Sequence, residues 1–359
     1  MDSESPDVAF ALIGHQDSWQ KISGFVNLLR NTSQEVEMTK EKIAEIYSYF
    51  PARVLFDIEV RSTTGKIAKG KYIETFISPD ELTLKHWKNN ISKVKQAADC
   101  ASKLHAGIAT LGGFTSIVLE GRVDMLNGNS LTSFTTGNTL TAAFIVKAIE
   151  KACEHFNKEL KDQNVLIIGS TGDIGSACVK YFSTKVNTLL LCARQQNLLL
   201  QQEKELLEKH IPAVASLDVT TLLPKADIII AIASSIIEDF DSALCKKDVI
   251  ICDAGYPKNL IDNLSEDLNK RLFCGGMGIV TGGYDFIPSF HHYLYNFPII
   301  NIGHGCLLEA VVLAFEKMNV AFSTGKGNIS PEKIEQMYAM AQKHGITEAP
   351  FFNTMGVWN

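Results

Sequence analysis

Residues 164–274 alternate between short apolar runs and helical stretches, and this alternation constrains the fold more than any other feature of the chain. Apolar runs at 164–168 and 188–192 are separated by a helical stretch that begins at Ile174, and a second helical stretch covers 195–209. Strand–helix–strand units of this kind form parallel sheets with right-handed crossovers. The pattern continues with apolar runs at 213–217, 227–233, 249–252 and 272–274. We therefore expect a doubly wound parallel sheet of six strands, buried on both faces.

Three glycines spaced three residues apart stand where the first of these strands turns into a helix. Gly169 permits a tight turn, Gly172 lets the backbone approach a pyrophosphate, and Gly175 lets the helix pack closely on the strand. The helix N-terminus adds free N–H groups and the positive end of the helix dipole. We expect a dinucleotide to bind here; a loop of the same shape that binds nothing is the alternative. The predicted binding set also contains other residues of the loop and of one strand end: Ser170, Thr171, Asp173, Ile174 and Ala233.

Arg194 indicates which dinucleotide is preferred. Enzymes that use NAD place an acidic residue at the end of the second strand, where it binds the ribose 2′-hydroxyl, whereas an arginine there accommodates a 2′-phosphate. This chain has Cys192, Ala193 and Arg194 at that position. We therefore expect NADPH rather than NADH. The alternative is that Arg194 is an ordinary solvated residue at the start of a helix.

The N-terminal part of the chain shows a mixed pattern. Strand-like runs at 10–13, 54–60 and 71–77 are interleaved with a helical stretch at 80–105, and residues 61–65 are typical of a turn. A polar connection at 121–133 precedes a long helix expected at 139–159. Toward the C-terminus we expect a helix at 306–319 and a last helix that starts at Pro331, is capped by Ser330 and ends before Gly345.

These patterns predict an α/β protein with more than one domain, which 359 residues can accommodate. We expect an N-terminal mixed α/β domain for the substrate at 1–138, a central doubly wound Rossmann domain with a bridging helix at 139–300, and a C-terminal helical segment at 301–359. The last segment would carry the nucleophile discussed below.

Composition excludes several classes of protein. The net charge of -6 provides no basic field for a phosphate backbone, so nucleic acid is not an expected partner. Eight cysteines show no CxxC spacing, so we expect no metal site and reduced thiols. The acidic start lacks the features of a secretory signal, and the apolar run at 228–237 is about half the roughly 20 residues of a membrane span. We expect a cytoplasmic protein, with peripheral association with membranes left open.

Six collinear motifs extend over nearly the whole chain. They are Leu12-Ile-Gly-His15, Thr64-Gly-Lys66 with Gly70-Lys-Tyr-Ile-Glu74, Leu111-Gly-Gly-Phe-Thr-Ser-Ile117, Phe134-Thr-Thr-Gly-Asn-Thr139, Thr171-Gly-Asp-Ile-Gly-Ser176 and Gly255-Tyr-Pro-Lys-Asn259. This set resembles the long-chain fatty acyl carrier-protein reductases, which form fatty aldehydes for alkane synthesis. The chain departs from the family pattern at Leu140, where the family has histidine, and at Gly303-His304-Gly305.

The resemblance implies that the protein reduces a fatty acyl thioester with NADPH and stops at the aldehyde. The acyl group would come from acyl carrier protein or coenzyme A, and an enzyme cysteine would carry it between two half-reactions. In the family that cysteine opens a helix and a glutamate follows three residues later, which matches Cys306 and Glu309. An aldehyde-consuming enzyme such as an aldehyde-deformylating oxygenase is a further expected partner.

Cys306 also has features of a nucleophile that do not depend on the family. It follows Gly303 and Gly305 and precedes an apolar helix, so we expect the helix dipole to lower the pKa of its thiol. The other seven cysteines lack this setting and are expected to behave as small hydrophobic residues. His304 is a candidate for supplying charge or a proton, with a structural role as the alternative. Glu309 either orients the site or interacts with the helix dipole.

An oxyanion that develops on the acyl group needs hydrogen-bond donors. Polar residues of the motifs are candidates, with loop-shaping or capping as the alternative role: Ser116, Asn138, Thr139 and Lys258. Two other functions remain open at this stage. A shikimate-dehydrogenase-like or glutamyl-tRNA-reductase-like oxidoreductase would act without a fatty acyl substrate. A non-catalytic module that senses NADPH or binds a carrier would bind the cofactor and form no aldehyde.

Overall fold

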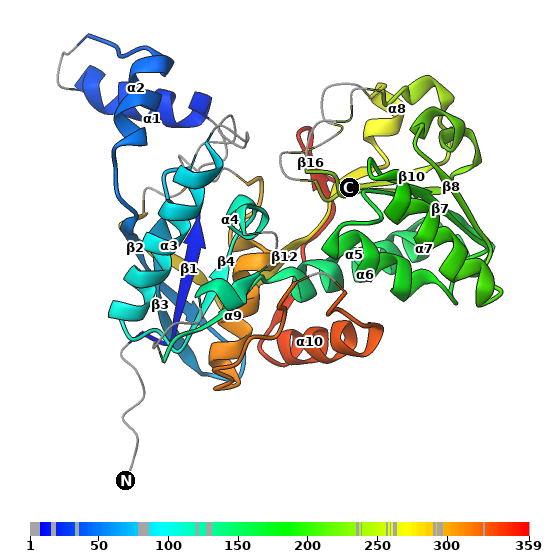
Figure 1. Ribbon diagram of the computed structural model, residues 1–359. Helices are drawn as coiled ribbons and strands as arrows, with labels where there is room; N and C mark the ends of the chain where they lie inside the picture. Colours follow the sequence, from blue (N-terminus) through cyan, green and yellow to red (C-terminus); the bar gives the residue numbers. More distant parts are fainter. Residues whose placement is uncertain are drawn as a thin grey trace. The chain divides into compact units, whose positions relative to one another are not determined.

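The computed structural model divides the chain into two compact units (Figure 1). It describes residues 8–15, 19–32, 36–77, 86–119, 122–126, 131–234, 237, 239–255, 258, 260, 264–289, 292, 297–325 and 327–358. Unit 1 comprises residues 1–137, 280–325 and 340–346, and unit 2 comprises residues 138–279, 326–339 and 347–359. This division places residues 280–325 with the N-terminal part of the chain. The domain boundaries expected from the sequence stay a prediction.

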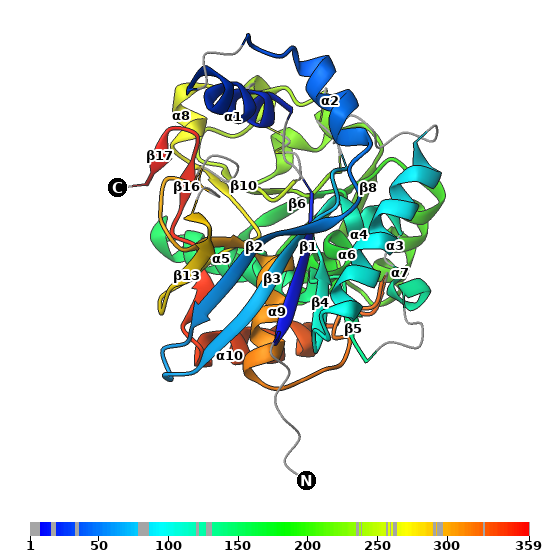
Figure 2. The ribbon, with the colours of Figure 1, turned by 90° about the vertical axis from the view of Figure 1, so that its left-hand side faces the viewer.

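Unit 1 is built around a mixed six-stranded sheet in the order β13-β2-β3-β1-β4-β5 (Figure 2). The central strand β1 pairs in parallel with β3 and β4, and β2 runs antiparallel to both β3 and β13. The strands are β1 (Phe10–Gly14), β2 (Arg53–Arg61), β3 (Ile67–Glu74), β4 (Ile108–Leu111), β5 (Ser133–Thr135) and β13 (Tyr284–Ile287). The helices of this unit are α1 (Trp19–Thr32), α2 (Lys40–Ser48), α3 (Trp87–Lys103), α4 (Phe114–Val118) and α9 (Gly305–Phe315).

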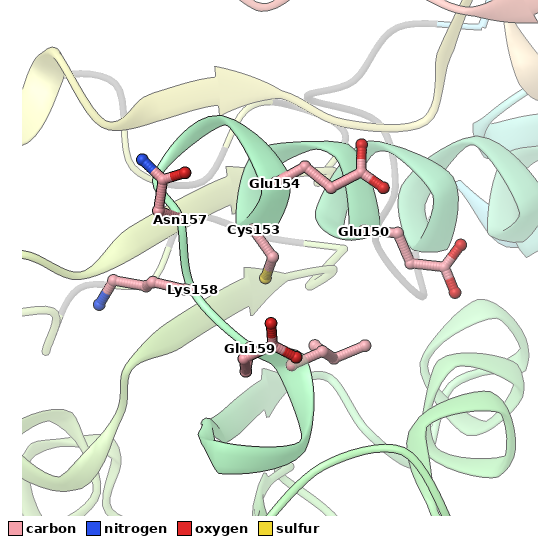
Figure 3. A pocket seen from close by; sticks show the side chains of 7 residues that line it. Glu150, Cys153, Glu154, Asn157, Lys158 and Glu159 are labelled. Atoms are coloured by element: carbon pink, nitrogen blue, oxygen red, sulfur yellow. The ribbon is translucent and has the colours of Figure 1, made fainter.

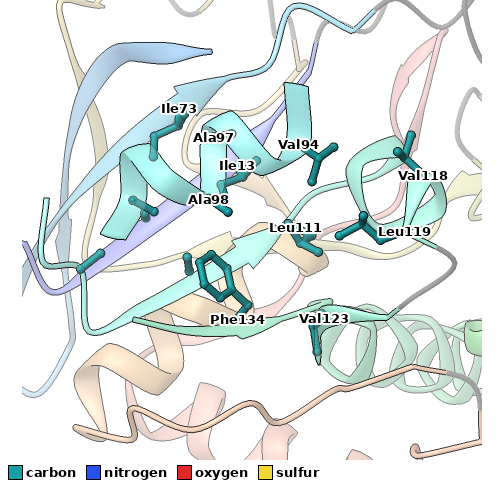
Figure 4. Close-up of a cluster of buried hydrophobic side chains, with 14 of the residues drawn as sticks. Ile13, Ile73, Val94, Ala97, Ala98, Leu111, Val118, Leu119, Val123 and Phe134 are labelled. Atoms are coloured by element: carbon teal, nitrogen blue, oxygen red, sulfur yellow. The ribbon is translucent and has the colours of Figure 1, made fainter. Parts of the chain in front are cut away.

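The two faces of this sheet are covered by different helices because side chains alternate along each strand. Ala11 and Ile13 of β1 point to the face on which α3 packs, and they share one buried cluster with Val94 and Ala98 of that helix (Figure 4). Thr110 of β4 points to the opposite face, where its hydroxyl donates a hydrogen bond to the α9 backbone. Helix α9 therefore packs on the face of the sheet opposite α3, and the hydrogen bond from Thr110 fixes the position of Cys306 at the start of α9.

Unit 2 contains a six-stranded sheet in which every pairing is parallel, in the order β11-β10-β9-β6-β7-β8. The strands are β6 (Asn164–Ile168), β7 (Thr188–Cys192), β8 (Ala213–Ser216), β9 (Ile228–Ala231), β10 (Ile250–Asp253) and β11 (Leu272–Cys274). Its helices are α5 (Asn138–His155), α6 (Asp173–Phe182), α7 (Gln196–Glu208) and α8 (Glu266–Asn269). The strand order reverses at β6, which is the arrangement of a dinucleotide-binding sheet. The predicted α/β fold class and the doubly wound sheet are confirmed.

The remaining elements belong to the C-terminal third of the chain and to short 3-10 turns. They are β12 (Met277–Val280), β14 (Ile302–His304), β15 (Ile346–Glu348), β16 (Phe352–Asn353), β17 (Gly356–Val357), α10 (Pro331–Lys343), η2 (Val123–Leu126), η3 (Leu160–Asp162), η4 (Val219–Thr221), η5 (Leu223–Lys225) and η6 (Ser242–Leu244). A three-stranded sheet has the order β14-β12-β15, and β16 pairs with β17. The Ser330 hydroxyl accepts a hydrogen bond from the Lys333 N–H, as the predicted cap requires. In the described part of the chain, no helix is sufficiently long and apolar to cross a membrane.

Several predicted segments differ in extent from the observed ones. The strand expected at 71–77 is β3 at 67–74, and the loop at 121–133 includes η2 and the start of β5. Residues 80–85 of the helix expected at 80–105 lie outside the described residues. The helices expected at 139–159 and 306–319 end early, at His155 and Phe315. The chain adopts left-handed backbone at Asn157 (φ 52°) and Lys317 (φ 56°), which stops each helix. Strands β12, β13 and β14 were not predicted.

Candidate active site

Cys306 occupies the second position of α9, directly after His304 and Gly305 at the helix start. The residue as a whole is half-buried, and its sulfur receives backbone N–H hydrogen bonds from Gly113 and Leu307. Its carbonyl oxygen accepts a hydrogen bond from the Thr110 hydroxyl at 2.6 Å. The nucleophile predicted from the sequence is therefore held by β4, by the turn that follows β4 and by its own helix.

Glycines of two motifs are required because the chain approaches α9 too closely for a side chain. A Cβ atom on Gly137 would lie 2.0 Å from the carbonyl oxygen of Cys306, and the residue has a φ of +72°. A Cβ atom on Gly112 would lie 2.7 Å from the Leu307 side chain. Such distances are far shorter than van der Waals contact, so only glycine, which has no side chain, fits at these two positions beside the start of α9.

Further motif residues of unit 1 hold this arrangement from a distance. The His15 ring nitrogen Nε2 accepts the N–H of Phe114 at 3.0 Å, and a Cβ atom on Gly113 would lie 2.4 Å from that nitrogen. At the other end of α9, the Lys66 ammonium donates to the carbonyl of Phe315 at 3.1 Å. Motifs that are widely separated in the sequence thus support one helix at its two ends.

Glu309 is fully buried one turn after Cys306. Its carboxylate accepts hydrogen bonds from the Thr135 hydroxyl at 2.5 Å and from the Ser323 hydroxyl at 2.8 and 3.0 Å. These contacts anchor α9 to β5 and to the segment that follows the helix. A buried carboxylate with such donors is costly to disrupt, so its geometry favours an anchoring role over direct chemistry.

The prediction that the helix start lowers the pKa of the nucleophile is wrong. Burial raises the pKa of Cys306 to about 11 and outweighs the N–H groups of Gly113 and Leu307, which favour the thiolate. The negative charge of Glu309 raises this pKa further. The cost of desolvating a charged sulfur exceeds the stabilisation that the helix start provides. Cys306 is therefore a thiol at neutral pH.

This raised pKa predicts how Cys306 reacts with a simple electrophile. We expect iodoacetamide to alkylate it slowly at pH 7 and about tenfold faster for each pH unit up to pH 9, because the thiolate fraction grows tenfold per unit below the pKa. Alkylation is followed by mass spectrometry of the peptide that contains Cys306. A rate that is already fast at pH 7 and flat up to pH 9 would contradict the raised pKa.

The glycine loop in unit 2 has the backbone that its sequence predicted. Gly169 turns with a φ of +91°, and a Cβ atom there would lie 2.6 Å from the carbonyl oxygen of Ile232. A Cβ atom on Gly175 would lie 2.1 Å from the carbonyl oxygen of Gly169, so α6 packs directly on the turn. Gly172 is exposed and precedes the first residue of α6. This shape fits a pyrophosphate at the helix N-terminus.

Polar residues surround this loop. The Asn138 amide donates to the Asp173 carboxylate at 2.7 Å, so this predicted oxyanion donor contacts the first residue of α6. Arg194 is exposed at the end of β7 and donates to the Ser234 hydroxyl at 3.3 Å. The loop residues Ser170, Thr171 and Ile174 lie between β6 and α6 or at the start of α6, and Ala233 lies two residues after β9.

The other predicted site residues are dispersed over several elements. Ser116 is buried on α4, and Thr139 and Leu140 are buried at the start of α5. The Lys258 ammonium donates to the carbonyl of Asp253, the last residue of β10, at 2.9 Å. His304 immediately precedes α9, and its ring lies 5.7 Å from that of Phe297. Catalytic roles for these residues stay a prediction.

Sequence reasoning missed Tyr284, which shares unit 1 with Cys306. A Cβ atom on Gly303 would lie 3.1 Å from the Tyr284 ring, and a negative charge on Cys306 raises the pKa of the phenol. Burial is the larger cause of that upward shift. The only sequence signal is the aromatic residue after Gly282-Gly283, which does not by itself indicate a site.

A surface depression of unit 2 contains none of these residues (Figure 3). It is lined by the end of α5 and the following turn, namely Glu150, Cys153, Glu154, Asn157, Lys158, Glu159 and Leu160. The Lys158 ammonium pairs with Asp248 at 2.6 Å, and burial raises the pKa of Cys153 to about 11. In the part of the chain that the structure describes, no three His, Cys, Asp or Glu side chains are grouped to hold a metal ion.

The chain is similar to a curated protein over almost its entire length. The long-chain acyl-[acyl-carrier-protein] reductase of Synechococcus elongatus is 30% identical over 360 residues, which cover 94% of this chain and 98% of that protein. This chain belongs to the long-chain acyl-[acyl-carrier-protein] reductase family. The resemblance predicted from the six motifs is confirmed, and the reductase is an oxidoreductase.

Other similarities of this reductase are weaker. The aminotransferase PigE of a Serratia species is 25% identical over 298 residues, which cover 81% of this chain and 34% of that protein. The solved structure of L-tryptophan dehydrogenase from Nostoc punctiforme matches 96% of this chain and 85% of its own at 11% identity, with a TM-score of 0.39. No protein-family model matches the chain.

Proposed function

We propose that this reductase converts a long-chain fatty acyl thioester to the fatty aldehyde, with NADPH as reductant and Cys306 as the covalent carrier of the acyl group. The observation that supports this most directly is the convergence of glycine motifs on the Cys306 backbone, with Gly137 in direct contact with it. The Synechococcus relative is an acyl-[acyl-carrier-protein] reductase, which supports acyl carrier protein as the donor of the acyl group. Coenzyme A is the alternative carrier.

In the first half-reaction Cys306 attacks the thioester carbonyl. Its thiol is protonated at neutral pH, so the proton must leave as the carbon–sulfur bond forms. The carbon–sulfur bond to the carrier then breaks, and the departing carrier sulfur takes up that proton to become a thiol. The N–H groups of Gly113 and Leu307 stabilise negative charge on the Cys306 sulfur during the attack.

In the second half-reaction the acyl–Cys306 thioester is reduced. A nicotinamide cofactor, when bound, supplies the hydride for the carbonyl carbon. The resulting thiohemiacetal oxyanion re-forms its carbonyl and expels the Cys306 sulfur, which frees the aldehyde. The same Gly113 and Leu307 N–H groups receive the thiolate, and protonation restores the thiol. The apolar aldehyde then passes to an aldehyde-consuming enzyme, such as an aldehyde-deformylating oxygenase.

The residues of unit 2 fit the cofactor. Gly172 leaves the start of α6 open to a pyrophosphate, and Gly169 and Gly175 have contacts that only glycine tolerates. Asn138 orients the Asp173 carboxylate at the same helix start. The exposed Arg194 guanidinium, which donates to the Ser234 hydroxyl, would donate hydrogen bonds to a ribose 2′-phosphate.

Replacing Arg194 by alanine tests the preference for NADPH. We expect the KM for NADPH to rise roughly 10- to 100-fold, because a charge-assisted hydrogen bond contributes about 1.5–3 kcal/mol, while the KM for NADH changes little. Initial rates with both cofactors measure this. Arg122→Ala is the control, since Arg122 is another exposed arginine, paired with Asp124 at 3.0 Å. An equal rise for both cofactors would contradict contact with the 2′-phosphate.

The covalent route is tested by intact mass. The reductase is mixed with a palmitoyl thioester of acyl carrier protein, and in parallel with palmitoyl-coenzyme A, without NADPH. We expect one added acyl group, located on the Cys306 peptide after digestion, which disappears as aldehyde forms when NADPH is added. Reduction to aldehyde without any adduct on Cys306, across several chain lengths, would refute the covalent step.

A further inference from the structure

We propose that Tyr284 is a catalytic residue whose hydroxyl donates a hydrogen bond to the carbonyl oxygen of the acyl group on Cys306. The proposal rests on the proposed function of Cys306 as the acyl carrier. Neither the sequence motifs nor the similar proteins assign a role to this tyrosine. The N–H groups of Gly113 and Leu307 contact the Cys306 sulfur. Tyr284 would supply a separate hydrogen-bond donor for the carbonyl oxygen of the acyl group.

The position of Tyr284 is tightly fixed by the residues around it. It is the first residue of β13, which pairs antiparallel with β2 and places Tyr284 opposite Val60. The two preceding glycines lie against Arg61, where a Cβ atom on Gly282 would be 1.9 Å from the carbonyl oxygen. Arg61 also forms an ion pair with Asp285, the next residue along the strand. The strand start therefore has little freedom to shift.

Contacts within unit 1 place the ring beside the start of α9. A Cβ atom on Gly303 would lie 3.1 Å from Cε1 of Tyr284 and equally close to the Leu308 side chain. Cε1 is adjacent to the carbon that bears the hydroxyl, so the polar end of the ring faces the segment that leads into Cys306. Gly303 belongs to β14 and is two residues before the first residue of α9. The electrostatic effect of Cys306 on the phenol agrees with this proximity.

The hydroxyl of Tyr284 is available for a ligand. The residue is 6% exposed, and its hydroxyl forms no hydrogen bond with the residues that the structure describes. The hydroxyl is not one of the fully buried polar atoms that lack a partner, so part of its surface is open to a water molecule or a ligand. The other end of the ring packs on Phe286, with centroids 4.8 Å apart. The ring is held in place, and its polar atom remains free for an acceptor.

The chemistry of both half-reactions supplies that acceptor. Attack by Cys306, and later hydride addition, each convert the carbonyl oxygen into an oxyanion. Tyr284 donates its hydrogen bond to this oxygen and keeps its proton, so no bond to the phenol breaks and the balance of the reaction is unchanged. Burial raises the pKa of Tyr284 above its ordinary value, so the phenol keeps its proton and remains a donor at neutral pH.

Tyr284→Phe tests this directly, because it removes only the hydroxyl and retains the ring. We expect the rate constant for acylation of Cys306, measured by quenched intact mass without NADPH, to fall roughly 100- to 1,000-fold. We expect kcat to fall similarly, with KM and the midpoint of urea unfolding near their wild-type values. Tyr47→Phe is the control, since Tyr47 is another tyrosine of unit 1, on α2, and its acylation rate should be unchanged.

The outcomes separate this inference from the proposed function. If wild-type protein acylates Cys306 and Tyr284→Phe does so at the same rate, Tyr284 is not an oxyanion donor and the proposed function stands. If the variant loses stability in parallel with activity, the hydroxyl has a structural role and the inference fails. If wild-type protein forms no adduct on Cys306 but still produces aldehyde, the proposed function itself fails.

Discussion

Replacing Cys306 by alanine is expected to lower kcat/KM for aldehyde formation by roughly a thousandfold or more, because the variant lacks the thiol that carries the acyl group in the proposed reaction. The variant should fold, since the substitution removes a single sulfur atom and the backbone hydrogen bond from Thr110 is retained. Aldehyde is measured by gas chromatography under single-turnover conditions, and no acyl adduct should appear in the intact mass.

A matched cysteine controls for damage to the fold. Cys100 lies on α3 in the same unit, is also half-buried, and has a pKa that burial raises. We expect Cys100→Ala to retain most of the wild-type rate, because its sulfur has no part in the proposed reaction. If Cys306→Ala retained turnover near that of Cys100→Ala, direct hydride transfer to the carrier-bound thioester would replace the covalent route.

Gly137→Ala is expected to lower the free energy of unfolding by roughly 2–5 kcal/mol and to abolish most activity. Its Cβ would lie 2.0 Å from the carbonyl oxygen and 2.5 Å from the Cα of Cys306, so the start of α9 must move. A left-handed φ adds about 1–2 kcal/mol for any residue with a side chain, and overpacking adds about 1–3 kcal/mol. Urea unfolding and the acylation rate of the purified variant measure the two effects.

Gly65→Ala separates the backbone cost from the steric one. Gly65 also has a left-handed backbone, with a φ of +84°, but nothing lies within 4 Å of a Cβ atom placed there. We expect it to lose only about 1–2 kcal/mol and to keep its activity. If both variants lost the same free energy of unfolding and the same activity, the close contact between Gly137 and Cys306 would contribute nothing beyond the cost of the left-handed backbone.

The sheet of unit 2 was predictable because local signals there agree with the tertiary structure. The apolar runs at 164–168 and 188–192 match β6 and β7 in both bounds, since each is a buried strand between clear turn signals. Gly169, Gly172 and Gly175 were interpretable because their spacing serves one local turn. A strand or turn can be predicted from the sequence when the interactions that determine it involve residues close together in the sequence.

The candidate site was less predictable because its contacts are long-range. Cys306 was identified from its helix start and its family pattern, but the sign of its pKa shift depends on burial by distant segments. Asn138 was a candidate oxyanion donor, which stays a prediction, and its amide donates to Asp173, a contact that no spacing indicates. Tyr284 belongs to a four-residue strand whose partner, β2, is more than 200 residues earlier. Only the fold brings these residues together.

Unit 1 is assembled from segments that are far apart in the sequence, and this affects how the protein folds during synthesis. All six strands of the unit 2 sheet lie within residues 164–274. The unit 1 sheet, in contrast, is complete only after β13 has been synthesised, and one of its faces is covered only after α9 has been synthesised. The first five strands leave the ribosome about 150 residues before β13, a delay of roughly 7 to 30 seconds at ordinary rates of synthesis. During that interval β2 presents an unpaired edge, and the apolar face beneath α9 is uncovered. The nascent chain is therefore most prone to aggregate, and most in need of a chaperone, before the segment that carries Cys306 has been synthesised.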